Sequence, residues 1–221
     1  MAAHPDHSVH IKSVELERII FFSDAVFAIA ITLLVLELRM PERLAGDADH
    51  QLAVGLLHLI PKFMSYAISF WLIGLYWWVH HRLFRHIRRW DDGLIWLNLH
   101  FLFWVAFVPF PVALVGSWGD RRGAVVFYAA TLLMMGLAQA LLWRHASRGK
   151  RLIDANFDPE YAHYITVRSW FAPVSTLVVI GLALLNPRFG WFGFWLIFPV
   201  QGWYRRRHKA MLARVEARGA A

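Results

Sequence analysis

The sequence contains no cysteine among its 221 residues, and it is poor in charged residues, which make up only 17%. The absence of cysteine excludes disulfide bonds, thiolate metal sites, a cysteine nucleophile and the covalent attachment of a c-type haem. An ordinary soluble domain is about 25% charged and roughly 45–50% apolar, whereas 58% of these residues are apolar. This balance argues against a water-soluble globule and favours a membrane protein.

Several motifs that carry enzyme or channel chemistry are also missing. There is no phosphate-binding Gly-x-x-x-x-Gly-Lys, no metal-binding His-Glu-x-x-His and no Gly-x-Ser-x-Gly nucleophile elbow. The Thr-Val-Gly-Tyr-Gly filter of common potassium channels is absent as well. We therefore expect no enzyme, and a potassium channel of the usual type is excluded.

Long apolar runs dominate what is present. A helix needs about 20 predominantly apolar residues to cross a bilayer, and six segments meet or approach that length. They predict an all-α integral membrane protein with helices at Ile19–Leu38, Ser65–Val79 with its preceding stretch, Gly93–Val115, Ala124–Trp143, Val167–Leu185 and Phe189–Trp203. We expect residues 1–18 to be an N-terminal tail, 19–204 the membrane domain and 205–221 a basic C-terminal tail.

Three local patterns refine this prediction. Asn186-Pro187 lies between the last two apolar runs and predicts a tight helical hairpin, because proline readily follows a helix end. Asn156-Phe-Asp-Pro-Glu160 is typical of a helix start, with Pro159 in the first turn. Residues Ala45–Ile60 have a helical apolar spacing that predicts an amphipathic entry into the second span, bent at Pro61.

The basic residues are distributed unevenly along the chain. If six spans alternate in direction, 17 of the 23 lysines and arginines fall on the side of both termini and 6 on the other side. Cytoplasmic loops near spans are enriched in these residues, so both termini are predicted to lie in the cytoplasm. There the charges would meet anionic lipid headgroups, which accounts for the net charge of +8 without a nucleic-acid partner.

The first apolar run contains an ionisable residue, Asp24, about one turn inside its predicted start. A charged side chain within a span costs about 2.5–3.5 kcal/mol on insertion scales, so those present are candidates for function. Asp24 can be a helix cap or a buried structural pair, or it can act in transport. Ile29, Leu33 and Leu36 follow at a spacing of four and three residues, which places them on one helical stripe. Such a stripe is by itself typical of contact with lipid or another helix.

Twelve histidines raise the question of haem or metal binding. Of these, only His100 lies well inside a predicted span, while His80 and His81 stand at a helix end. A membrane b-type cytochrome needs pairs of histidines on facing helices. We therefore expect no cofactor and assign His80, His81, Asn98 and His100 to hydrogen bonds between helices.

A longer motif carries a family resemblance. The segment Arg18-x-x-x-Phe22-Ser23-Asp24, continued by Ala28-Ile-Ala-Ile-Thr-Leu-Leu-Val-Leu-Glu37, resembles the signature of the prokaryotic members of the transmembrane protein 175 family, which are cation channels. The resemblance continues through Trp77-Trp-Val-His80-His81-Arg-Leu-Phe84, Leu97-Asn98-Leu-His-Phe and Pro109-Phe-Pro111. It covers the N-terminal half strongly and the rest only by length and number of spans.

The resemblance implies a homotetramer of six-helix subunits that conducts K⁺ through a central pore lined by the first helix of each copy. Carried over by position, Ile29, Leu33 and Leu36 form the apolar constriction, and Thr32 offers hydroxyl groups to the ion. A ring of such side chains can close a pore by dewetting. Selectivity for K⁺ over Na⁺ would then rest on the lower cost of partly dehydrating the larger ion.

The resemblance also assigns roles around this stripe. The motif residues Arg18, Phe22, Ser23 and Asp24 imply a structural network that ties the first helix to the next two, with His80 or His81 and Asn98 as partners. Asp24 is also a candidate for influencing gating or proton passage. Glu37 can concentrate cations at the outer mouth of the pore, or it can be an ordinary interfacial carboxylate facing Arg39.

Two other functions stay open. A proton-coupled secondary transporter is supported by Asp24 and His100, although the sequence has no internal repeat of the kind that many transporters carry. A haem-binding or metal-binding redox protein is the third alternative.

Overall fold

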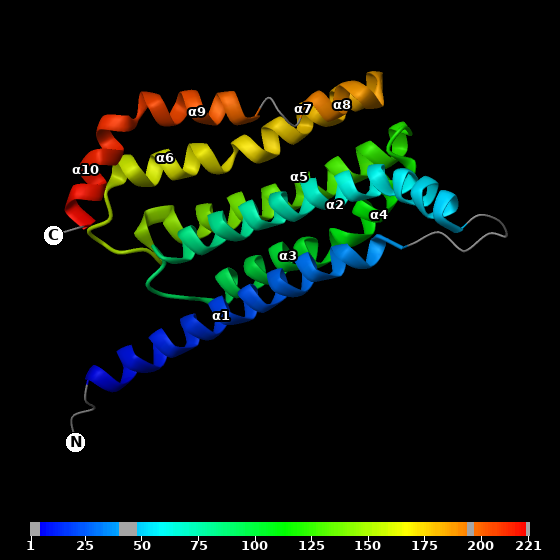
Figure 1. Ribbon diagram of the computed structural model, residues 1–221. Coiled ribbons are helices and arrows are strands. Elements are labelled where there is room, and N and C mark those ends of the chain that lie inside the picture. The colour runs from blue at the N-terminus through cyan, green and yellow to red at the C-terminus, as the bar shows by residue number, and fades with distance from the viewer. Residues whose placement is uncertain (1–4, 40–47, 194–196, 220–221) are drawn as a thin grey trace.

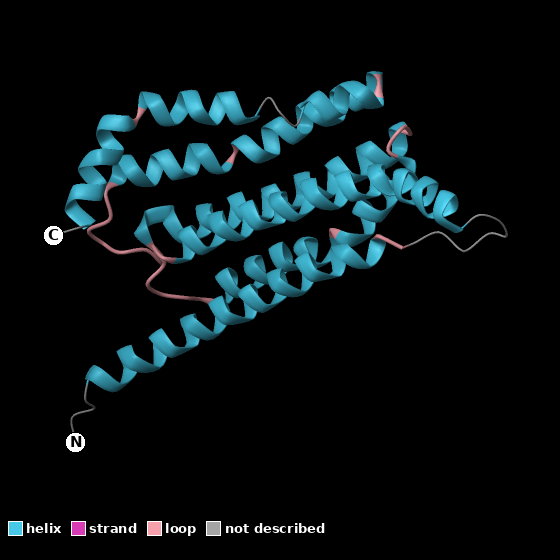
Figure 2. Cartoon of the chain, viewed as in Figure 1, coloured by secondary structure: helices cyan, strands magenta, loops and turns pink. Residues whose placement is uncertain are grey.

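The computed structural model describes residues 5–39, 48–193 and 197–219, and the regular structure in these ranges is helical (Figures 1 and 2). The helices, in chain order, are α1 Pro5–Leu33, the 3-10 helix η1 Leu34–Glu37, α2 Ala48–Phe84, α3 Asp92–Phe107, α4 Pro109–Trp118, α5 Arg122–Ser147, the 3-10 helix η2 Arg148–Lys150, α6 Pro159–Ser169, α7 Phe171–Leu185, α8 Pro187–Gly193, α9 Ile197–Arg207 and α10 Lys209–Gly219. The all-α prediction is therefore confirmed.

Five stretches of the described chain are long and apolar enough to cross a membrane. They are Val14–Glu37, Asp49–Phe84, Asp92–Trp118, Arg122–Lys150 and Pro159–Leu185. Each overlaps one of the first five predicted spans, and four of them contain the predicted span entirely. The sixth predicted span, Phe189–Trp203, includes residues 194–196 and so lies partly outside the described residues.

Several helix boundaries differ from the prediction. Helix α1 begins at Pro5, so most of the expected N-terminal tail is helical. The α2 helix runs from Ala48 through Pro61 to Phe84, so the described part of the predicted entry segment continues directly into the second span. The third span divides at Val108 into α3 and α4, because Pro109 and Pro111 lack the amide hydrogens that a continuous helix needs.

The two predicted helix signals further along the chain are confirmed. Asp158 caps α6 by accepting hydrogen bonds from the amides of Glu160 and Tyr161. The hairpin at Asn186 is present, and the Asn186 side chain accepts a bond from the Arg188 amide at 2.9 Å. Gly190 allows α8 to pack closely against α7, since a Cβ atom there would lie 2.8 Å from that of Ala183.

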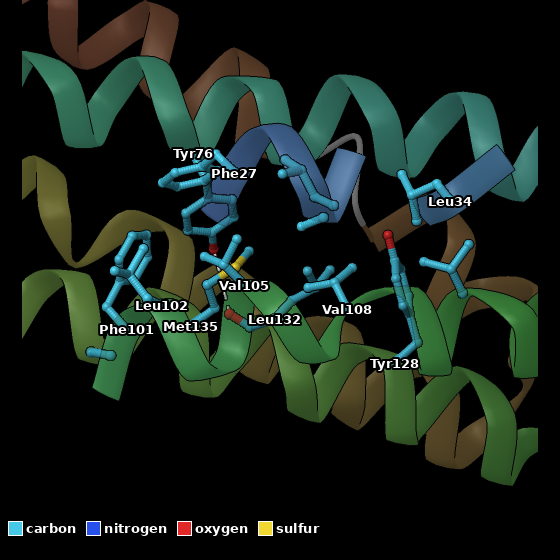
Figure 3. Close-up of a cluster of buried hydrophobic side chains, with 14 of the residues drawn as sticks. Phe27, Leu34, Tyr76, Phe101, Leu102, Val105, Val108, Tyr128, Leu132 and Met135 are labelled. Atoms are coloured by element: carbon cyan, nitrogen blue, oxygen red, sulfur yellow. Dashed lines mark hydrogen bonds between the residues drawn. The ribbon is translucent and has the colours of Figure 1, made fainter. Parts of the chain in front are cut away.

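The core lies where α1, α2, α3 and α5 meet. Figure 3 shows Phe27 of α1 beside Tyr76 of α2, with Phe101 of α3 and Met135 of α5 completing the cluster. The Tyr76 hydroxyl donates to the Leu132 carbonyl at 3.4 Å. Helices in a membrane associate through such close packing and hydrogen bonds rather than through the hydrophobic effect, because lipid is as apolar as leucine.

The connections at one end of the bundle are tied together. The Leu152 carbonyl accepts bonds from the amides of Arg88 and Arg89, which joins the α2–α3 loop to the segment after α5. The Asp91 carboxylate caps α3 through the Leu94 amide at 2.8 Å. Asp91 also contacts His145 at 2.9 Å and Arg151 at 3.0 Å.

This clustering affects the ionisation of Asp91. Burial raises the pKa of its carboxyl, but the hydrogen bonds from His145 and the Leu94 amide and the positive charges of His145 and Arg151 outweigh burial. The pKa therefore lies below its ordinary value.

The described part of the segment that was predicted to be a basic C-terminal tail is helical and packs against α6. Met211 of α10 is buried against Tyr161 and Tyr164 of α6, and Arg214 pairs with Glu160 at 3.4 Å. In Figure 1, α10 ends at the same side of the molecule as the start of α1.

Candidate functional site

Helix α1 has two unlike faces. Ser23, Phe27, Ala30 and Leu34 are each no more than 1% exposed, and they follow one another at intervals of four, three and four residues. That interval is the repeat of one helix face. This face holds α1 against α2 and α3.

The opposite face of α1 carries the predicted constriction residues. Ile29, Leu33 and Leu36 are 59%, 40% and 59% exposed. Thr32 is exposed as well, and its hydroxyl bonds the backbone carbonyls of Ala28 at 3.0 Å and Ile29 at 2.9 Å. The structure thus brings the four residues to one side of the chain, with Leu36 in the tighter turn of η1.

A buried chain of hydrogen bonds begins at Ser23. Its hydroxyl donates to the Ile19 carbonyl at 2.8 Å and accepts from the Asn98 amide nitrogen at 3.0 Å. The Asn98 oxygen lies 2.9 Å from Nε2 of His80, which therefore donates to it. The His80 ring stacks on Phe101 with a centroid distance of 5.2 Å. Side chains of α1, α2 and α3 are linked in this way.

Asp24 has a different partner. Its carboxylate is half-buried and accepts a bond from the indole nitrogen of Trp77 at 2.8 Å. His81 is exposed, with its ring 5.8 Å from that of Trp77. Arg18 and Phe22 are exposed too. Of the residues assigned to the network, the structure links Ser23, His80 and Asn98 directly, whereas Arg18, Phe22 and His81 take no part in these bonds.

The Trp77 contact was not anticipated from the sequence. The sequence does contain a signal for this contact. Trp77 lies one helical turn before His81 and so on the same helix face, and its indole is a hydrogen-bond donor suited to the edge of an apolar span. The family motif had instead suggested His80 or His81, together with Asn98, as partners of the cluster that includes Asp24.

Glu37 ends η1 and is half-buried. It lines a small cleft together with Lys62 and Tyr66 of α2 and with Gly116 of α4. The basic residue among those that line this cleft is Lys62.

The histidines do not gather around a common centre in the described chain. No group of three or more histidine, aspartate or glutamate residues in these ranges is arranged to hold a metal ion. His100 is exposed on α3, and its Nε2 accepts a bond from the Trp104 indole at 3.2 Å.

Comparison with known proteins identifies relatives of this chain. The family model described as endosomal/lysosomal potassium channel TMEM175 matches residues 18–109. A potassium channel of Streptomyces collinus is 35% identical over 173 residues, which are 76% of this chain and 82% of that protein. A potassium channel of Chamaesiphon minutus is 36% identical over 175 residues, which are 78% of this chain and 86% of that protein.

A solved structure extends the likeness to the fold. The crystal structure of a lysosomal potassium-selective channel TMEM175 homologue from Chamaesiphon minutus superimposes with a TM-score of 0.72 at 32% identity. The match covers 88% of this chain and 98% of that one. The chain is thus a multi-pass membrane protein, and it belongs to the TMEM175 family.

Proposed function

We propose that this protein is a potassium-selective channel that conducts K⁺ passively through a central pore between four copies. The observation that carries the proposal is the apolar face of α1, where Ile29, Leu33 and Leu36 are 59%, 40% and 59% exposed in one chain. The relatives named as potassium channels support the same function. The proposal is that α1 of each copy turns this face toward the pore axis.

The chemistry of this face fits an apolar constriction. Four copies of each branched side chain form a ring that water leaves easily, and such a ring closes a pore by dewetting. An ion that passes it sheds part of its hydration shell, which costs less for K⁺ than for the smaller Na⁺. The Thr32 hydroxyl donates its hydrogen to the backbone, so its oxygen is free to face the cation.

The network behind this face gives the pore helix a fixed position. Ser23, Asn98 and His80 join α1 to α2 and α3 by buried bonds. Asp24, bonded to Trp77, is proposed to act in gating and to permit proton passage. Glu37 is proposed to attract cations at the outer end of α1.

The proposed topology has six spans with both termini in the cytoplasm of the cell. The sixth span would be the predicted run Phe189–Trp203, whose described residues lie in α8 and α9, within a membrane domain of residues 19–204. The start of α1 and the end of α10 lie at the same end of the bundle (Figure 1), as an even number of crossings requires. The excess of lysine and arginine at that end, 17 against 6, supports its cytoplasmic placement.

Anionic lipids are proposed partners at the same end. The Arg82 guanidinium lies 4.8 Å from the Trp78 ring centroid, and that of Arg207 lies 5.5 Å from the Trp203 ring. Tryptophan and arginine together are typical of the headgroup region, where each positive charge contributes about 1 kcal/mol of attraction.

Ion flux in reconstituted liposomes tests the proposal. With K⁺, Na⁺ and H⁺ gradients compared, we expect passive K⁺ flux larger than Na⁺ flux. Ile29→Asn should reduce this preference, because an amide in the ring can replace water around Na⁺. Leu177→Asn, at a 55% exposed position of α7, serves as the matched control and should leave the preference unchanged. Absence of flux of any cation, or flux that requires a proton gradient, would overturn the proposal.

A further inference from the structure

Asp24 and His100 are ionisable side chains on the surface of the candidate membrane spans. Asp24 is half-buried on α1 and His100 is exposed on α3. Ionisable residues inside a membrane normally pair with one another or face a cavity, because lipid offers them no hydrogen bonds. Within a single chain each of the two is bonded to an indole, Asp24 to Trp77 and His100 to Trp104, and no ion pair of either is found among the described residues.

Each of the two groups has a free position that complements the other. The Trp77 indole occupies Oδ1 of Asp24, which leaves Oδ2 as an acceptor. An indole nitrogen can only donate, so Nε2 of His100 must accept the bond from Trp104. The proton of a neutral His100 ring is therefore on Nδ1, where it is available as a donor.

The two groups also lie at nearly the same depth. The bond between Ser23 and Asn98 fixes the register of α1 and α3, and both helices run in the same direction in Figure 1. Asp24 lies one residue beyond this bond and His100 two residues beyond it. With a rise of about 1.5 Å per residue, their depths differ by about 1.5 Å.

Their directions keep them apart within one chain. Successive helical residues are about 100° apart, so His100 lies about 200° around α3 from Asn98, on the side turned away from α1. The surface around His100 is apolar and open, with Trp96 71% exposed and Phe103 60% exposed. A neighbouring helix can cover this surface without displacing anything.

We propose that the Asp24 carboxylate of one copy accepts a hydrogen bond from the His100 imidazole of the adjacent copy. Rotation about an axis along the membrane normal leaves depth unchanged, so the α1–α2 edge of one copy meets the α3 face of the next at matching height. Such a heterologous contact closes into a ring. The inference rests on the ring of copies in the proposed function and adds the contact that joins them.

Cysteine crosslinking tests the contact directly, because the natural sequence has no cysteine. A tagged Asp24→Cys chain is co-expressed with an untagged His100→Cys chain and treated with a short bis-methanethiosulfonate crosslinker. The crosslinker is needed because a disulfide requires closer Cβ atoms than an aspartate–histidine pair provides. We expect a mixed-size dimer on a gel that disappears on reduction. Leu177→Cys in place of Asp24→Cys is the control and should give no such band.

A second pair of variants leaves Asp24 and its Trp77 bond in place. His100→Leu removes the donor at an exposed position, and His100→Gln keeps one. We expect His100→Leu to weaken association about threefold for each interface, as the loss of one membrane hydrogen bond does, and His100→Gln to retain most of it. Native mass measurement in detergent gives the assembled fraction.

The outcomes separate this inference from the proposed function. Assembled tetramers without the mixed-size dimer, or with the same dimer yield in the control, would overturn the Asp24–His100 contact and leave the channel intact. Unchanged assembly of His100→Leu would overturn it as well. A monomeric wild-type protein would instead remove the ring on which both proposals depend.

Discussion

Helices α5 and α1 are both long and apolar, yet they differ in how much of their surface the rest of the chain buries. In the most apolar stretch of α5, 61% of the residues are buried, against 22% in that of the α1 span, although the α1 stretch is the more apolar of the two. Trp143 and Leu142 of α5 are completely enclosed, whereas Ile29 and Leu36 of the α1 span are 59% exposed. Apolar composition therefore shows that a helix can enter a membrane, but not what will cover it there. Most of the α5 stretch is therefore covered within one chain, while most of the α1 stretch is not.

Trp143→Ala should have the largest effect, because it removes the largest fully buried side chain of α5. It also deletes the indole bond to Thr166 at 3.0 Å. Replacing a buried tryptophan by alanine costs about 3–5 kcal/mol in soluble cores, and we expect a value near the lower limit because lipid cancels part of the transfer term. Thermal unfolding in detergent measures the loss. A stable variant would show that α5 is not the packing centre.

Asn98→Ala should have the next largest effect. It removes two buried hydrogen bonds and leaves Ser23 and His80 without the partner that joins them. We expect a loss of about 1–2 kcal/mol in stability, and a looser position of α1 that lowers K⁺ selectivity. Asn98→Asp, which keeps the acceptor for His80 but not the donor for Ser23, divides the effect between the two bonds. Unchanged selectivity in a destabilised Asn98→Ala protein would limit the network to folding.

The contrast between Ser23 and Asp24 shows how far sequence reasoning reaches. The family motif and the polarity of Asn98 predicted that Ser23, Asn98 and one of the two histidines belong to one network, because polar groups inside spans normally pair with one another. His80 and His81 could not be distinguished, since adjacent residues differ by about 100° around a helix and only packing decides which is inside. The Trp77 partner of Asp24 was missed, because the pairing depends on how α1 and α2 are rotated. The docking of α10 depends in the same way on tertiary contacts.

Asp91→Ala should have a smaller effect, at the end of the bundle where α3 and α5 meet. It removes the cap of α3 and the contacts to His145 and Arg151, and loss of a helix cap costs about 1 kcal/mol. The pKa of Asp91 is lower in the folded protein than in the unfolded chain. Its contribution to stability is therefore complete above the unfolded pKa of about 4 and is lost as the pH falls through the folded pKa.

Unfolding temperatures measured at pH 7 and at decreasing pH values below 4 test this prediction. The difference between the wild type and Asp91→Ala should shrink as the pH falls. Asp154→Ala, in the segment after α5, is a suitable control, because the Asp154 carboxylate bonds only the nearby Asn156 amide among the described contacts. A difference that does not change with pH would contradict the prediction, because both the cap and the contacts to His145 and Arg151 depend on the ionised carboxylate.

Leu36→Ala should have the smallest effect on folding and a clear effect on conduction. Leu36 is 59% exposed, whereas Leu34, two residues earlier in the same 3-10 helix, is completely buried. Leu34→Ala opens a cavity within one chain and should cost about 2 kcal/mol in stability, while Leu36→Ala should cost less than about 0.5 kcal/mol, as surface changes do.

If α1 lines the pore, the smaller ring at position 36 dewets less readily, so K⁺ flux should rise in Leu36→Ala and not in Leu34→Ala. Thermal unfolding and liposome K⁺ flux, both measured on the Leu34→Ala and Leu36→Ala proteins, distinguish an effect on packing from an effect on permeation. Equal flux in Leu36→Ala and the wild type would mean that the exposed face of α1 is covered by lipid, and the contrast with α5 would then reflect position in the bundle rather than a pore.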